Sequence, residues 1–77
     1  MESKISQANS RIKWLEEMYA MEIEWAKSTQ MISQDASPRI EDLYDLSEED
    51  YQAAQSLALP EIAAQHRGAV MIRDILA

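Results

Sequence analysis

Four glutamates within the stretch KWLEEMYAMEIEW, residues 13–25, are the first side chains of this chain whose type and spacing could do chemistry. Glutamates that face inward from a helix can hold a di-iron centre when other helices supply Glu-x-x-His pairs. The chain has a single histidine, His66, and no glutamate stands three positions before it. The motif is therefore missing, and we interpret Glu16, Glu17 and Glu24 as a solvated charged face.

A second group of carboxylates lies between residues 41 and 50, with no basic residue among them. Its members are Glu41, Asp42, Asp45, Glu48, Glu49 and Asp50. The run lacks the D-x-D-x-D-G spacing and the closing glutamate of a calcium loop. Two interpretations stay open, because acids in the first turn of a helix stabilise its macrodipole, whereas a concentrated negative field steers a basic partner. The first is the favoured interpretation, and the second is kept because residues 35–77 hold nine acids against three bases.

No other catalytic or ligand-binding pattern is found along the chain. His66 stands near the edge of an apolar helix face, and we interpret it as a boundary residue rather than a catalytic one. A serine nucleophile needs a base within hydrogen-bond reach, and no Gly-rich turn is present to expose one. Phosphate-loop, dinucleotide and zinc spacings are also missing. We expect neither enzyme activity nor a cofactor nor a metal.

The composition favours a small acidic protein that associates with a partner. A chain of 77 residues buries a modest core, and without cysteine it has no disulfide to reinforce that core. With 47% apolar residues, oligomerisation is the remaining reinforcement. The net charge of −7 disfavours direct binding to nucleic acid and to anionic membranes.

We expect a cytoplasmic location. The first ten residues, MESKISQANS, lack the apolar core of a signal peptide, and the lack of cysteine is compatible with a reducing compartment. No apolar run is long enough to span a bilayer.

The residues from about 4 to 33 predict one long helix. This range has no glycine or proline, and its apolar residues recur at steps of three and four. The first apolar stripe consists of Ala8, Ile12, Leu15, Tyr19, Ile23 and Ala26. The second stripe consists of Trp14, Met18, Met21, Trp25 and Ile32. Together the two stripes cover roughly 200° of the helix surface, which is about twice what one core needs.

Three shorter helices are predicted after the long one. Ser37 and Pro38 are typical of an N-cap and a first helical position, followed by apolar residues at Ile40, Leu43 and Tyr44. Ser47 is the expected cap of the next helix.

Asp50 stands at the capping-box position of that helix, and Leu46 and Tyr51 are spaced as a hydrophobic staple. The helix is expected to end near Leu57. Pro60 starts the last helix, and its apolar face consists of Ile62, Gly68, Ala69, Ile72, Ile75 and Leu76. Gly68 permits close approach of another helix.

These patterns predict an all-α helical bundle, a single domain of residues 1–77, that dimerises through the long helix. The second stripe has the composition of an interface core, with aromatic and adaptable methionine side chains. The expected interface residues are Arg11, Trp14, Leu15, Met18, Met21, Glu22 and Trp25. The alternative is a monomer in which the shorter helices cover both stripes.

Glu22 lies inside the apolar sector, on nearly the same side as Arg11. It is either a boundary residue whose stem covers apolar surface, or one half of an ion pair across a helix interface. In an antiparallel two-fold dimer with its axis near Glu16 and Glu17, each Arg11 would meet Glu22 of the second copy.

The sequence as a whole favours a non-enzymatic protein–protein interaction module, a small acidic adaptor or inhibitor. Small acidic helical regulators of this type are plausible in phages and bacteria, including inhibitors that occupy a basic site on their partner. The expected partners are a second copy and a basic protein, with no direct nucleic acid and no membrane. The alternative is a structural subunit whose role is oligomerisation within a larger assembly.

Overall fold

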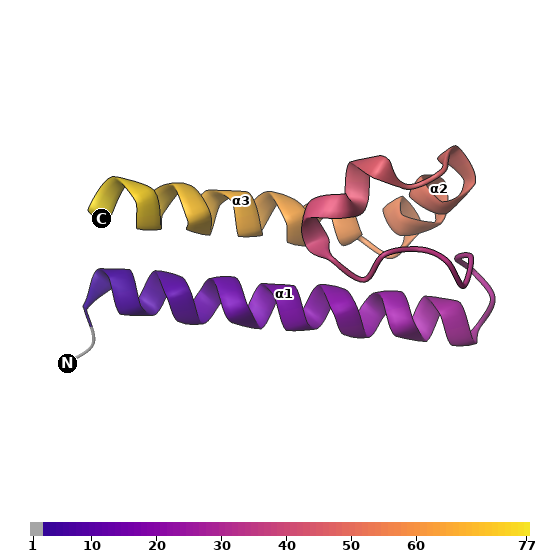
Figure 1. Cartoon of the computed structure of the whole chain (residues 1–77), viewed down its shortest axis with the longest axis horizontal. Coiled ribbons are helices and arrows are strands. Elements are labelled where there is room, and N and C mark those ends of the chain that lie inside the picture. The colour runs from indigo at the N-terminus through magenta and orange to yellow at the C-terminus, as the bar shows by residue number, and fades with distance from the viewer. Residues whose placement is uncertain (1–2) are drawn as a thin grey trace.

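The computed structural model describes residues 3–77, and every regular element in that range is helical. The first helix, α1, spans Lys4–Ser28, and it is followed by a 3₁₀ helix, η1 (Ile40–Asp45), and by the helices α2 (Glu48–Ser56) and α3 (Leu59–Leu76). α1 and α3 run antiparallel along the molecule, and η1 and α2 gather at the end away from the two termini (Figure 1). The predicted all-α fold with a long N-terminal helix is confirmed.

α1 contributes to the core mainly through one stripe, although Met18 of the second stripe also packs against it, partly buried. The buried residues of α1 are the six of the first predicted stripe: Ala8, Ile12, Leu15, Tyr19, Ile23 and Ala26. The largest of them share one apolar cluster with Leu43 of η1, Ala54 of α2 and Ile62 of α3. The three later elements therefore pack on the same side of α1.

α1 ends at Ser28, so the predicted helix of about residues 4–33 is too long. The chain leaves the helix through Gln30, whose φ of 62° is left-handed. The backbone N–H groups of Gln30 and Met31 donate to carbonyls of the last turn, at 3.1 and 2.8 Å. This pair of hydrogen bonds is a Schellman motif, which usually has glycine at the left-handed position. Because glutamine stands there, the sequence gives little sign of the stop.

The loop between α1 and η1 is held down by two apolar side chains. Ile32 and Ala36 are buried in the core cluster, so Ile32 contributes from the loop and not from the second stripe of α1. The expected helix start at Ser37 is also wrong, because η1 begins at Ile40. The Ser37 hydroxyl instead accepts a hydrogen bond from the Arg39 backbone N–H, at 3.2 Å, and so stabilises a turn before the helix.

The start of α2 follows the predicted cap. The Ser47 hydroxyl accepts a hydrogen bond from the Asp50 backbone N–H at 3.2 Å, which confirms Ser47 as the N-cap. The reciprocal half of a capping box is not formed, since the Asp50 carboxylate accepts hydrogen bonds from Ser33 instead. Leu46 and Tyr51, the expected staple residues, are both half-buried against the core.

The burial of apolar residues differs along α3. Ile62 and Ala69 are buried as predicted, whereas Ile72, Ile75 and Leu76 of the same predicted face are exposed. A Cβ atom added to Gly68 would meet no heavy atom within 4 Å. Within the described residues no other element fills the space at Gly68, so the close approach that this glycine permits is not used inside the chain.

Tyr19 stands at the centre of the core with an unpaired hydroxyl. The residue is fully buried, and its hydroxyl oxygen has no hydrogen-bond partner among the described residues. Burial, and secondarily the charge of Asp42, raises the pKa of Tyr19 to about 12. The hydroxyl is thus held neutral, and its desolvation is not compensated by a partner.

We expect Ser47→Ala to lower the free energy of unfolding by about 1 kcal/mol, because the Asp50 N–H loses its acceptor. Urea denaturation followed by circular dichroism measures this change. Ser56→Ala, in the last turn of α2, is the matched control, and it should change stability little because alanine has the higher helix propensity. An equal loss in both variants would contradict the cap.

Tyr19→Phe should raise the free energy of unfolding by about 1 kcal/mol at pH 8, because it removes a buried hydroxyl that has no partner. The effect should grow at alkaline pH. The unfolded chain releases the tyrosine proton near the ordinary tyrosine pKa of 10.0, whereas the folded chain holds it to about 12, so the wild type loses stability as the pH rises through this window.

Urea denaturation at pH 8 and pH 11 tests both parts of the Tyr19 prediction. Tyr44→Phe is the control, since Tyr44 is exposed and its hydroxyl accepts a hydrogen bond from Arg67, so no comparable gain in stability is expected from it. A less stable Tyr19→Phe variant would mean that the hydroxyl is in fact bonded.

Candidate functional site

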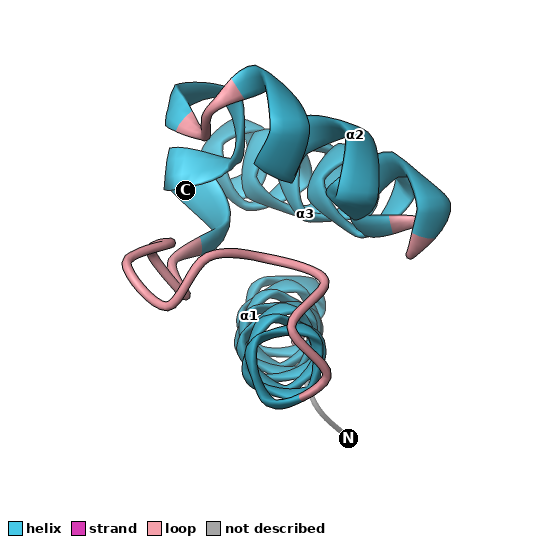
Figure 2. Cartoon of the chain, turned by 90° about the vertical axis from the view of Figure 1, so that its right-hand side faces the viewer, coloured by secondary structure: helices cyan, strands magenta, loops and turns pink. Residues whose placement is uncertain are grey.

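The second stripe of α1 remains exposed along the helix. Trp14, Met21 and Trp25 are 52%, 71% and 51% exposed, and Met18 between them is half-buried. In the view along α1, the other elements gather on one side of it (Figure 2). The shorter helices therefore do not cover both stripes. Leu15 is only 1% exposed and packs inside the core, so its assignment to an interface is wrong.

Arg11 and Glu22, the two charges expected at the interface, do not pair within the chain. The Arg11 guanidinium donates to the side-chain carbonyl of Gln65 on α3 at 3.1 Å. Its carbon also lies 5.8 Å from the centre of the Trp14 ring, which is a cation–π distance. Glu22 is half-buried and forms no hydrogen bond or ion pair with another described residue. Glu22 is therefore available to a cation outside the chain.

A hollow of about 500 Å³ opens between the start of α1 and the end of α3. Small side chains at Ala8 and Ala69 and the bare backbone of Gly68 leave it open, and Ile72 contributes apolar wall. Arg11 stands at its margin, so the hollow adjoins the exposed stripe. Sequence reasoning missed this feature, although small residues at the facing ends of two helices were a signal for it.

A second hollow, of about 410 Å³, is surrounded by aspartates at the other end of the molecule. Asp42, Asp45 and Asp50 of the predicted acidic run line it, together with Asp35, which was not predicted. The structure thus brings three of the six predicted residues to one place. Ser33, Ser37 and Ser47 line part of the remaining wall of this acidic hollow, together with the apolar side chains of Ala36 and Leu46.

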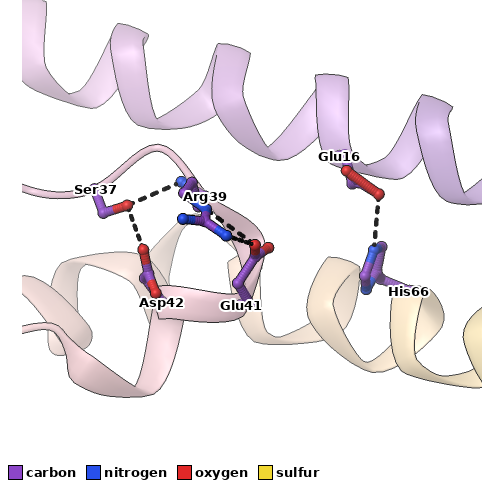
Figure 3. Close-up of polar contacts among 6 residues, drawn as sticks. All are labelled: Glu16, Ser37, Arg39, Glu41, Asp42 and His66. Carbon is purple, nitrogen blue, oxygen red and sulfur yellow. Dashed lines mark hydrogen bonds and ion pairs between the residues drawn. The ribbon is translucent and has the colours of Figure 1, made fainter.

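The position of Asp50 is fixed by hydrogen bonds to the loop. Its carboxylate oxygens accept from the Ser33 backbone N–H at 3.1 Å and from the Ser33 hydroxyl at 2.7 Å. The pKa of the Asp50 carboxyl is lowered, chiefly because the Ser33 hydroxyl stabilises the charged form. Asp42 is held in a similar way by the Ser37 hydroxyl at 2.7 Å (Figure 3). The loop therefore positions two of the four charges.

The other half of the predicted acidic run points elsewhere. Glu41 accepts a hydrogen bond from the Arg39 guanidinium at 2.9 Å (Figure 3). The pKa of its carboxyl is lowered, first by its own backbone N–H and then by Arg39. Glu48 and Glu49 are exposed in the first turn of α2 and do not line the acidic hollow. A structural role in the first turn of a helix is sufficient to explain these three carboxylates.

His66 and Glu16 form a polar contact between α3 and α1. The Nε2 atom of His66 lies 3.3 Å from a Glu16 carboxylate oxygen (Figure 3). Glu16 is therefore not simply part of a solvated face, and sequence reasoning missed a contact between residues that are far apart in the chain. A shallow depression beside His66 also contains Tyr44 and Arg67, and the Tyr44 hydroxyl accepts a hydrogen bond from Arg67. No serine, threonine or cysteine among the described residues lines this depression.

Residues 3–77 contain neither a candidate metal-ligand cluster nor a helix fit to span a membrane. No three histidine, aspartate or glutamate side chains in this range converge on a point that could hold a metal ion. The four aspartates of the acidic hollow therefore line it without forming a metal-ligand cluster. None of the helices in this range combines the length and the apolar character that crossing a membrane requires.

No family model, curated protein or solved structure matches the chain. Its functional surfaces are therefore inferred from its own residues.

Proposed function

We propose that this chain is a non-enzymatic protein–protein interaction module, a small acidic cytoplasmic adaptor or inhibitor that acts as a homodimer. The observation that carries the proposal is the exposed line of Trp14, Met21 and Trp25 on α1. Single exposed apolar residues are normal on a protein surface, whereas a contiguous line of aromatic and methionine side chains is typical of an interface. Covering these side chains removes apolar surface from water, worth about 25 cal/mol per Å².

The spacing of the exposed face favours a second copy of α1 as its cover. The face consists of Gln7, Arg11, Trp14, Met18, Met21 and Trp25. These positions alternate in steps of four and three, the spacing with which two helices pack along a seam. They are also symmetric about Glu16, so an antiparallel two-fold pairing matches the face to itself. Trp14 then packs on Met18 of the second copy.

The acidic hollow supports a second partner of opposite charge. It lies where the loop, η1 and α2 meet, at the end of the molecule away from the termini (Figure 1). A lysine or arginine side chain entering it would find four aspartates, two of them held by serine hydroxyls. Because the apolar face runs along α1, a dimer leaves the acidic hollow open. This arrangement supports an adaptor or inhibitor over a subunit whose only role is oligomerisation.

Self-association is tested by sedimentation velocity at micromolar concentration, where the wild type should be a dimer. Trp14→Ala should weaken the dimer by about 2–4 kcal/mol, because hot spots of this size are central aromatic residues. Lys13→Ala, one position away on the charged face, is the matched control and should leave the dimer unchanged. A wild type of monomer mass would contradict the proposal.

The acidic hollow is tested with two variants of equal net charge. Asp35→Asn with Asp45→Asn removes two charges from the hollow, and Glu48→Gln with Glu49→Gln removes two charges outside it. The probe is a short oligolysine peptide, whose association rate at low salt should fall more in the hollow variant, since fixed charges steer encounter.

High salt should abolish the binding of oligolysine in all variants, because screening weakens exposed charges. Equal rates for the two variants would mean that only net charge acts, and the hollow would then have no specific role. Circular dichroism verifies that both variants keep the fold.

A further inference from the structure

The apolar hollow between α1 and α3 contains space that the chain itself does not fill. A Cβ at Gly68 would touch nothing within 4 Å, although this glycine lies in the interior of α3. Glycine inside a helix costs about 0.5–1 kcal/mol relative to alanine. Nothing within the described residues offsets that cost, so the space at Gly68 is better explained by an occupant from another molecule.

The margin of this hollow selects an acidic occupant. Lys4 and Arg11 both line it, and they are cations on a chain whose net charge is −7. The floor is apolar, with Ala8, Ala69 and Ile72. A fitting ligand therefore combines an apolar group with a neighbouring carboxylate.

The chain carries such a group on its own α1. Trp25 is 51% exposed, and Glu22, one turn before it, has no partner among the described residues. An indole side chain buries about 150–250 Å² and so gains most from a concave apolar site. The hollow of about 500 Å³ has room for it.

The register of the antiparallel pair brings Trp25 and Glu22 of one chain next to the apolar hollow of the other. Symmetry about Glu16 sets residue 25 of one chain opposite residue 7 of the other, and Gln7 lines the hollow. The same register sets Met21 opposite Arg11, so the adjacent Glu22 reaches the Arg11 guanidinium. Residues 7 and 25 are about 27 Å apart along an α-helix, so both ends of the seam can form these contacts at once.

We propose that Trp25 of each chain inserts into the α1–α3 hollow of the other chain, with Glu22 paired to Arg11 at its margin. The inference rests on the proposed self-association and adds its specific mode. Gly68 is then an interface residue, since its missing side chain makes room for the indole ring of the second copy.

The decisive variant is Gly68→Leu, which places an apolar side chain in the hollow from a position where an added Cβ meets no neighbouring element within 4 Å. Leucine is a good helix former, so circular dichroism and thermal unfolding of the monomer should show a fold at least as stable as the wild type. Sedimentation velocity should show a dimer weakened about tenfold or more, because the docking site of Trp25 is blocked. Ala64→Leu, an exposed position of α3 outside the hollow, should leave the dimer unchanged.

Fluorescence reports the environment of Trp25 directly. In a Trp14→Phe background Trp25 is the sole tryptophan, and its emission should shift to shorter wavelength as concentration rises through the dimer range. Adding Gly68→Leu should remove that shift. If the Gly68→Leu chain dimerises as tightly as the wild type and keeps the shift, Trp25 docks elsewhere and the inference is overturned, while the proposed dimer stands. A monomeric wild type would instead overturn both.

A charge exchange tests the register even if Gly68→Leu loses its helical signal. Arg11→Glu and Glu22→Arg should each weaken the dimer, because each sets like charges opposite one another. The double exchange should restore most of the affinity. Two single effects that simply add in the double variant would exclude the Arg11–Glu22 contact and with it this register.

Discussion

Burial of one stripe of α1 against α3 is the contact from which the other features of this molecule derive. The stripe is narrow because the residues after α1 supply only one short 3₁₀ helix and two helices, all packed on the same side. Once Tyr19 and Ile23 are buried, the geometry of a helix turns Trp14, Met21 and Trp25 outward. The apolar face is thus a consequence of which stripe of α1 the core buries.

Helical periodicity predicted the two apolar stripes of α1, because steps of three and four encode a helix face. The aromatic and methionine content of the second stripe indicated which of the two stays exposed. The Ser47 cap was equally readable, since its signal is local. The end of α1 was not readable from the sequence, because Gln30 adopts a left-handed conformation that usually belongs to glycine. Contacts between distant residues, such as Glu16 with His66, leave no local pattern and needed the fold.

The candidate surfaces, like the fold, could be predicted where their signal is local and not where it depends on tertiary contacts. The exposed stripe followed from its spacing, although Leu15 was wrongly included, since it faces the core. The acidic run was recognised as a group, but a sequence does not say where η1 and α2 turn its members. In the folded chain Asp42 lines the acidic hollow together with Asp35 of the loop. The neighbouring Glu41 does not line it and accepts a hydrogen bond from Arg39 instead. The apolar hollow depends on which helix ends meet, and that is a tertiary property.

The pairing of α1 with α3 also has a consequence for the order of folding. Its contacts join residues about 50 positions apart, such as Glu16 with His66 and Arg11 with Gln65. Contacts of high sequence separation form late, because a long loop must close first. During synthesis α1 therefore emerges with both apolar stripes uncovered, and the core stripe stays so until α3 has left the ribosome. Because exposed apolar surface makes partly folded chains associate, we expect a nascent chain to be most prone to self-association through α1 in this interval.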